Sequence, residues 1–252
     1  MTKLTHVYIQ ARIGSKRLPK KILKKICGKS ILSLIHDRLT NIKDVNKIHL
    51  VTGDLINNSE LIEEARRLKI EYFSGNEENI LDRFNSAANK FSSDIIIRVN
   101  GDCPLIDFNV IEKGLEIFNK NNYDILSITR KRTYPHGFDF EIFSKSALTR
   151  SWKINLANFT NEEEFKKSPI NPTKYMLEND QDFSNYDLIN HVNLSHIRLT
   201  LDYDEDFELI QKIYEHLYSQ NNKFSLPEIM DYLNNNPSLL EINKKHAIYS
   251  NI

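Results

Sequence analysis

The feature that most constrains the fold is a regular alternation of strand-like and helix-like segments along the first half of the chain. Residues 94–99 form a β-branched run between polar residues, which is typical of a buried central strand. The segments between such runs place apolar residues every three to four positions, as a helix with one buried face does. Strands that alternate with helices form mostly parallel sheets that helices cover on both faces. The sequence therefore predicts an α/β fold.

The apolar patterns also predict the bounds of the elements. Strands are expected at residues 7–11, 47–52, 70–73, 94–99, 123–129 and 195–201. A further strand, half exposed, is expected near residues 138–142, where apolar residues alternate with Asp139 and Glu141. Helices are expected at residues 30–42, 58–68, 78–91, 107–119, 204–219 and 225–234, the fourth with Asp107 as its N-cap.

The pattern loosens between residues 130 and 193, in a region that includes a stretch rich in Asn, Glu, Lys and Pro. A chain of 252 residues is long enough for one large α/β domain. We therefore expect a single domain over residues 1–252, with residues 130–193 as an inserted region that carries substrate contacts, dimer contacts or both.

The connection after the first predicted strand is long and strongly basic. Between residues 10 and 30 it has no acidic side chain and eight basic ones, which are Arg12, Lys16, Arg17, Lys20, Lys21, Lys24, Lys25 and Lys29. The whole chain has 34 basic and 34 acidic residues, so positive charge is concentrated here. Gly14 allows the backbone to approach a ligand closely, and Ser15 adds a hydroxyl. The pattern favours phosphate binding over the alternative of a solvated basic loop.

Gly28-Lys29-Ser30 resembles the end of a Walker A loop, but this interpretation fails. A Walker A loop has a glycine five positions before the second one, and the chain has Leu23 there. The three residues also open a helix instead of following a strand.

Carboxylates follow two of the predicted strands. Asp102 comes directly after residues 94–99, between Gly101 and Pro104, and Asp202 follows residues 195–201. Ligands of parallel sheets bind at the carboxyl ends of the strands, and Mg²⁺ is usually held by one or two carboxylates together with phosphate oxygens. The sequence thus predicts that Asp102 and Asp202 are ligands of Mg²⁺. The alternative for Asp102, that it only forms a turn, is less well supported. For Asp204 and Asp206 the better interpretation is that they cap the following helix or place favourable negative charge in its first turn.

Composition limits the class of protein further. The neutral net charge argues against a nucleic-acid partner, and the basic loop lacks the aromatic residues of a stacking platform. No apolar run is long enough for a membrane helix, and the first residues lack the apolar stretch of a signal peptide. Two cysteines without metal-ligand spacing argue against disulfides or zinc. We expect a cytoplasmic protein with neither a nucleic-acid nor a membrane partner.

Several motifs together resemble one family, the cytidylyltransferases. They occupy residues 10–23, 28–29, 81–84, 98–107, 134–143 and 198–202, and they cover nearly the whole chain. The resemblance includes the acylneuraminate and 3-deoxy-manno-octulosonate enzymes and is closest to the spore-coat-polysaccharide type. It implies a Rossmann-like nucleotidyltransferase fold of the glycosyltransferase-A type, Mg²⁺ as cofactor and a homodimer.

The resemblance also implies roles for individual residues. It implies catalytic roles for Arg12, Arg17, Lys21 and Asp102, and nucleotide binding by these four together with Gln10, Ala11, Gly14, Ser15 and Arg83. It implies metal binding by Asp102 and Asp202, and binding of the acceptor by Tyr134, His136, Asp139 and Glu141. His136 has an equally good interpretation as a surface-loop residue. Close relatives carry a Glu-His-Val-Thr-like segment in the middle region, where this chain has Ser168-Pro169-Ile170-Asn171-Pro172-Thr173-Lys174-Tyr175, which leaves the acceptor open.

The implied reaction is attack of an acceptor oxygen on the α-phosphorus of CTP, with release of pyrophosphate, for surface glycan biosynthesis. A sugar acid and a sugar or polyol phosphate both remain as acceptors. One alternative is a glycosyltransferase that uses a nucleotide sugar, although Gly101-Asp102-Cys103 lacks the Asp-x-Asp pair such enzymes usually have. A non-catalytic nucleotide-binding protein of a glycan pathway is the other alternative.

Overall fold

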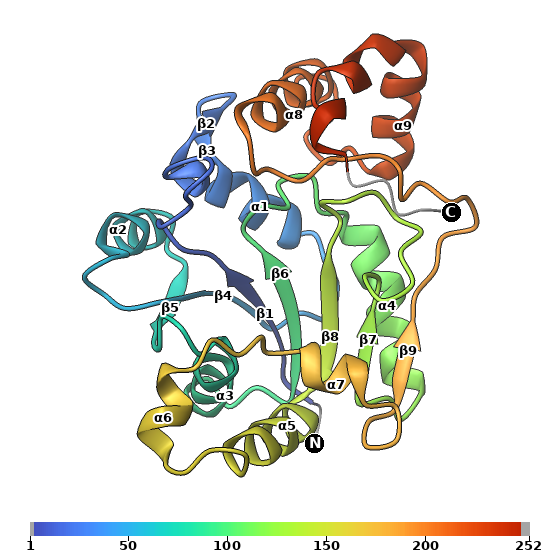
Figure 1. Cartoon of the computed structure of the whole chain (residues 1–252). Helices are drawn as coiled ribbons and strands as arrows, with labels where there is room; N and C mark the ends of the chain where they lie inside the picture. The colour runs from blue at the N-terminus through green and yellow to red at the C-terminus, as the bar shows by residue number, and fades with distance from the viewer. Residues whose placement is uncertain (1–2, 248–252) are drawn as a thin grey trace.

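A seven-stranded sheet forms the centre of the computed structural model, which describes residues 3–247 (Figure 1). Its order is β5-β4-β1-β6-β8-β7-β9. The strands are β1 (Thr5–Gln10), β4 (Lys47–Thr52), β5 (Glu71–Ser74), β6 (Ile95–Asn100), β7 (Ile125–Ser127), β8 (Phe140–Ser144) and β9 (Asn185–Asp187). Pairing is parallel except for β8, which is antiparallel to both β6 and β7. The predicted α/β class with a mostly parallel sheet is confirmed.

Nine α-helices surround the sheet within residues 3–247. They are α1 (Ile31–Leu39), α2 (Ser59–Arg67), α3 (Ile80–Lys90), α4 (Phe108–Lys120), α5 (Lys145–Leu156), α6 (Glu162–Lys167), α7 (Lys174–Glu178), α8 (Asp204–Leu217) and α9 (Leu226–Asn235). Three 3-10 helices, η1 (Lys21–Leu23), η2 (Pro237–Glu241) and η3 (Lys244–His246), and a small hairpin of β2 (Lys25–Ile26) and β3 (Lys29–Ser30) complete this part of the chain. None of the helices in it is long and apolar enough to cross a membrane.

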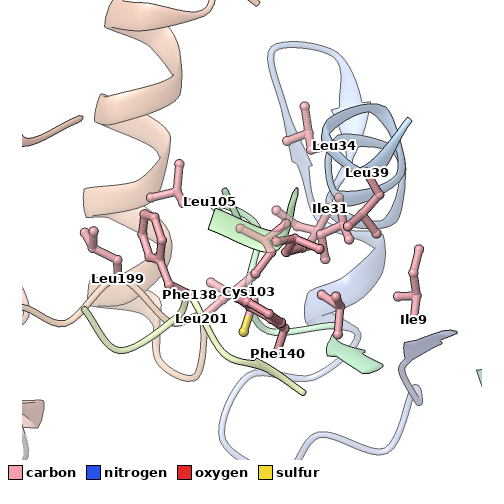
Figure 2. Close-up of a cluster of buried hydrophobic side chains, with 14 of the residues drawn as sticks. Ile9, Ile31, Leu34, Leu39, Cys103, Leu105, Phe138, Phe140, Leu199 and Leu201 are labelled. Atoms are coloured by element: carbon pink, nitrogen blue, oxygen red, sulfur yellow. The ribbon is translucent and has the colours of Figure 1, made fainter. Parts of the chain in front are cut away.

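The alternation of side chains along β1 and β6 creates a core on each face of the sheet. Val7, Ile9 and Ile97 belong to the larger cluster, whereas Tyr8 and Ile96 belong to the smaller one. The larger cluster is covered by α1, α4, α8 and α9, and the smaller one by α3, α5 and α7 (Figure 1). Figure 2 shows part of the larger cluster, where side chains from β1, α1, the segment after β6 and the segment before α8 meet.

Capping side chains fix the starts of several helices near the carboxyl edge of the sheet. Ser30 accepts a hydrogen bond from the N–H of Ser33 at the start of α1, so Gly28-Lys29-Ser30 does open a helix. Asp107 accepts from Asn109 and Val110 at the start of α4, and its prediction as N-cap is confirmed.

Two of the predicted strands need correction. Residues 138–142 are not half exposed, because β8 lies between β6 and β7 and its first four residues are buried. Residues 195–201 do not form a strand in this structure, where a single bridge joins Arg198 to His136. The segment begins in a turn at residues 195–196, and most of it is buried, including the consecutive residues 197–199, but no strand of the described part of the chain pairs with it over its length.

Residues 130–193 contribute β8 and β9 to the central sheet and α5 and α7 to the layer over the smaller cluster, and Phe165 of α6 packs against Trp152 of α5. The sequence did not predict these three helices, β9 or the hairpin of β2 and β3. Whether this region binds an acceptor or a second copy of the chain, and the division of residues 1–252 into domains, stay predictions.

Candidate functional site

A cavity of about 540 Å³ lies at the carboxyl ends of β1 and β6. Its wall is formed by Gln10, Ala11, Arg12, Gly14, Ser15, Lys16, Arg17, Lys21, Ile22, Ile80, Arg83, Arg98, Asn100, Gly101, Asp102 and Asp202. All nine residues predicted to bind a nucleotide, and both predicted metal ligands, are among them. The structure therefore brings these residues together, and their individual roles stay predictions.

Apolar anchors hold the basic loop against the fold. Leu18 and Ile22 are almost completely buried, whereas the side chains of Arg12 and Arg17 are more than half exposed. The N–H of Ser15 donates to the carbonyl of Ile13 over 2.8 Å, which forms a tight turn around Gly14. Leu18 and Ile22 fix the backbone of the loop, so the side chains of Arg12 and Arg17 can extend into the cavity.

The two predicted metal ligands share one ammonium group. The Nζ of Lys21 lies 2.8 Å from Oδ1 of Asp202 and 3.3 Å from Oδ2 of Asp102. It also donates to the carbonyl of Leu201 over 2.7 Å, and Arg17 contacts the other oxygen of Asp202 at 2.8 Å. Two segments a hundred residues apart are thus joined by one side chain of the basic loop.

These cations decide the ionisation of Asp202. Burial raises the pKa of Asp202, but the hydrogen bond and charge of Lys21 and the charge of Arg17 outweigh burial. The net result is a pKa below the usual value for an aspartate. Asp202 is therefore a carboxylate at neutral pH.

The donor set at this edge fits a hard divalent cation that also binds phosphate. Asp102 and Asp202 supply carboxylate oxygens to the same cavity, and both are partly exposed. Within residues 3–247, no group of three or more His, Cys, Asp or Glu side chains is placed to hold a metal ion. Mg²⁺ would therefore take its remaining ligands from phosphate oxygens and water, as it usually does in nucleotide sites.

Asp206 does not line the cavity but holds the backbone of Asp202, which does. Its buried carboxylate accepts hydrogen bonds from Arg198, from Asn243 and from the backbone N–H groups of Asp202 and Tyr203. This carboxylate completes a capping box at the start of α8, which confirms the capping interpretation of Asp206. Asp204 lies exposed in the first turn of the same helix, as expected.

Arg98 is a cavity residue that the sequence analysis missed. Its Nε donates to Gln10 over 2.7 Å, its Nη2 to Asn100 over 3.0 Å and its Nη1 to Glu141 over 2.9 Å. Burial raises the pKa of Glu141, and the charge of Arg98 opposes that rise without cancelling it. The available signal was a charged residue inside an otherwise apolar strand, which requires a buried partner.

Arg83 lines the cavity from α3. Burial lowers the pKa of its guanidinium to about 10, and the charge of Glu77 opposes that shift. Its Nη1 donates to the carbonyl of Asn76 over 2.8 Å, whereas its buried Nε–H has no acceptor among residues 3–247. A buried donor without a partner is costly, so a ligand atom that accepts from it would bind favourably.

None of the four residues predicted to bind the acceptor lines this cavity. Tyr134 is buried in the larger core cluster, and Asp139 pairs with Arg132. The backbone of His136 is bound to Ile197 and Leu199, and burial lowers the pKa of its ring.

Glu141 lines a second cavity of about 320 Å³, to which Arg98 also belongs. Arg98 is therefore shared by both cavities. The predicted role of all four residues in binding the acceptor stays untested.

Known proteins resemble this chain over most of its length. A family model described as cytidylyltransferase matches residues 7–231. The uncharacterized protein MJ1063 of Methanocaldococcus jannaschii is 32% identical over 93% of this chain and 92% of its own length. The spore coat polysaccharide biosynthesis protein SpsF of Bacillus subtilis is 25% identical over 91% of this chain and 93% of its own.

A solved cytidylyltransferase from Leptospira borgpetersenii has the same fold. It superimposes with a TM-score of 0.84 at 28% identity, over 98% of this chain and all of the other. The Rossmann-like nucleotidyltransferase fold is therefore confirmed. With the match of the family model over most of its length, this chain belongs to the cytidylyltransferase family.

Proposed function

We propose that this protein is a Mg²⁺-dependent cytidylyltransferase. It would transfer the cytidylyl group of CTP to a sugar acid or to a sugar or polyol phosphate and release pyrophosphate. The observation that carries the proposal is one cavity in which the basic loop meets Asp102 and Asp202. The name of SpsF, a relative in spore coat polysaccharide biosynthesis, supports a role in making surface glycans.

The side chains of the basic loop would position the triphosphate and neutralise its charge. An acceptor oxygen attacks the α-phosphorus in line with the departing pyrophosphate, so catalysis is mainly orientation and electrostatic stabilisation. Arg12, Arg17 and Lys21 are partly exposed cations of the cavity lining that can contact phosphate oxygens. A bound Mg²⁺ held by Asp102 and Asp202 would supply a Lewis acid that stabilises charge on those oxygens.

Lys21 prepares both carboxylates for this role. It holds Asp102 and Asp202 on one side of the cavity before a ligand binds, and it keeps Asp202 ionised. The pair is therefore oriented in advance, which reduces the reorganisation that binding requires. The two acceptor classes differ in chemistry, because a sugar hydroxyl has to lose a proton and a phosphate oxygen does not.

The test is release of pyrophosphate from each of the four nucleoside triphosphates in the presence of Mg²⁺. The acceptors would be nonulosonic acids, 3-deoxy sugar acids, and sugar and polyol phosphates. We expect release with CTP and with one class of acceptor. Equal rates with all four nucleotides would contradict the assignment of CTP.

The same assay separates the alternative functions. Transfer of sugar from a nucleotide sugar, without pyrophosphate, would indicate a glycosyltransferase. Binding of CTP without turnover on any acceptor would indicate a non-catalytic nucleotide-binding protein. We also propose a homodimer, and light scattering of the purified protein would measure its mass in solution.

A further inference from the structure

Three α-helices within residues 3–247 begin with an asparagine N-cap, and the side chain of one of these asparagines does not cap its helix. Asn79 accepts a hydrogen bond from the N–H of Asp82 in α3, and Asn161 accepts from that of Glu164 in α6. Asn58, at the start of α2, makes no such bond, although asparagine is among the best capping residues. Asn58 is nevertheless almost completely buried, so its side chain has another function.

The side chain of Asn58 joins three separate segments. Its Oδ1 accepts from the N–H of Ile13 in the basic loop over 3.0 Å. Its Nδ2 donates to the carbonyl of Asp54 over 2.9 Å and to Oε2 of Glu77 over 3.1 Å. The backbone beside Gly14 is thus tied to the turn after β4 and to the segment before α3.

Glu77 extends this connection to a cation of the basic loop. Its Oε2 also accepts from the N–H of Asp54, and its Oε1 lies 3.6 Å from Nη1 of Arg12. A Cβ added to Gly53 would lie 1.5 Å from Oε2 of Glu77, so glycine leaves the space that this carboxylate fills. The position of Glu77 is therefore built into the backbone.

We propose that Asn58 and Glu77 are positioning residues for the nucleotide, an inference that rests on the proposed function. Asn58 fixes the backbone of the basic loop in the conformation that binds the triphosphate. Glu77 holds Arg12 as a temporary counter-ion, and Arg12 exchanges this carboxylate for a phosphate oxygen when CTP binds. Neither residue lines the cavity, so both act through the loop.

Asn58→Ser tests the first half of the proposal. Serine caps a helix as well as asparagine does, but its shorter side chain cannot reach the N–H of Ile13. The substitution also removes the donations to Asp54 and Glu77, but only the bond to Ile13 acts directly on the loop. We expect about five- to tenfold weaker binding of CTP by calorimetry, the effect of losing that bond. Asn161→Ser is the matched control, because it keeps a capping residue on α6, and its affinity should equal that of the wild type. Unchanged affinity in a folded Asn58→Ser protein would overturn the role of Asn58.

Glu77→Gln tests the counter-ion role of Glu77, and it keeps the proposal testable if Asn58→Ser fails to fold. Glutamine keeps an acceptor for Asn58 and Asp54 but removes the charge that competes for Arg12. We expect about two- to fivefold tighter binding of CTP and a lower KM with kcat unchanged, since exposed ion pairs contribute little. Equal or weaker binding would overturn the counter-ion role. A wild-type protein that does not bind CTP at all would instead overturn the proposed function.

Discussion

Two charged clusters lie at the same cavity, which all their members except Glu141 line, and they differ in how firmly their charges are held. The mouth cluster consists of Arg17, Lys21, Asp102 and Asp202, which are all partly exposed. Its cations and carboxylates contact each other at 2.8 to 3.3 Å, and each carboxylate keeps exposed surface for a ligand. Such pairs can exchange partners when a phosphate or a metal ion enters.

The wall cluster consists of Gln10, Arg98, Asn100 and Glu141. Arg98 and Glu141 are both buried, and Arg98 donates to all three other members. Breaking a buried ion pair costs much free energy, because water cannot solvate the charge that remains. Similar ion pairs at one edge of a sheet can therefore have different functions. The mouth cluster binds the ligand, and the wall cluster maintains the shape of the cavity.

The largest expected effect is a loss of stability on breaking the wall cluster. Arg98→Met leaves Glu141 buried without a counter-ion and should lower the free energy of unfolding by about 3–5 kcal/mol. Urea denaturation would measure this change. Arg98→Met combined with Glu141→Gln should be less destabilising than Arg98→Met alone, because no unpaired charge remains. If Arg98→Met unfolds at the wild-type urea concentration, the two clusters do not differ in the proposed way.

Asp102→Asn should have the opposite profile. It removes one charge of the predicted metal site and should lower kcat/KM about a hundred- to a thousandfold. The free energy of unfolding should change little, because Asp102 is partly exposed and Lys21 keeps Asp202 as a partner. Pyrophosphate release and urea denaturation on the same preparation would separate the two effects. Near-normal rates would mean that Asp102 has no role in the reaction.

Lys21→Ala should have a smaller effect on the rate, about ten- to a hundredfold in kcat/KM for CTP. Lys24→Ala is the matched control, since Lys24 belongs to the same basic loop but does not line the cavity, and its ammonium contacts the exposed Asp204 at 3.5 Å and the Phe207 ring. Its kcat/KM should stay within about threefold of the wild-type value. Equal effects of the two substitutions would mean that the loop acts through its total charge and not through the mouth cluster.

The mouth cluster could be predicted from the sequence, because each of its residues lies in or next to a short local pattern. Arg17 and Lys21 stand in one basic run, and Asp102 and Asp202 each follow an apolar segment. The parallel order of β1 and β6 then brings Lys21 and Asp102 to one edge of the sheet. Asp202 reached that edge without the predicted strand, because backbone hydrogen bonds join the preceding segment to Asp102 and His136 in place of a ladder.

The wall cluster could not be predicted in the same way. Its pairing depends on β8 lying antiparallel to β6, and a charged residue in each strand does not reveal that the two will meet. The position of Glu141 in an alternating pattern suggested an exposed face, which the ion pair with Arg98 overrides. Similarly, α5 was missed because it buries only Ala147, Leu148 and Ser151, which makes a weak apolar stripe.

The smallest expected effect concerns how stability changes with pH, and here the two clusters should have opposite signs. The folded protein lowers the pKa of Asp202 below 3.8, so the unfolded chain binds its proton first as pH falls. Asp202 therefore contributes stability above pH 3.8 that is lost as pH falls through the folded pKa. The folded protein raises the pKa of Glu141 above 4.5, so its contribution to stability falls as pH rises from 4.5 through the folded pKa. Urea denaturation at several pH values should show that Asp202→Asn removes the first slope and Glu141→Gln the second. Slopes of the same sign for the two carboxylates would contradict the distinction between the clusters.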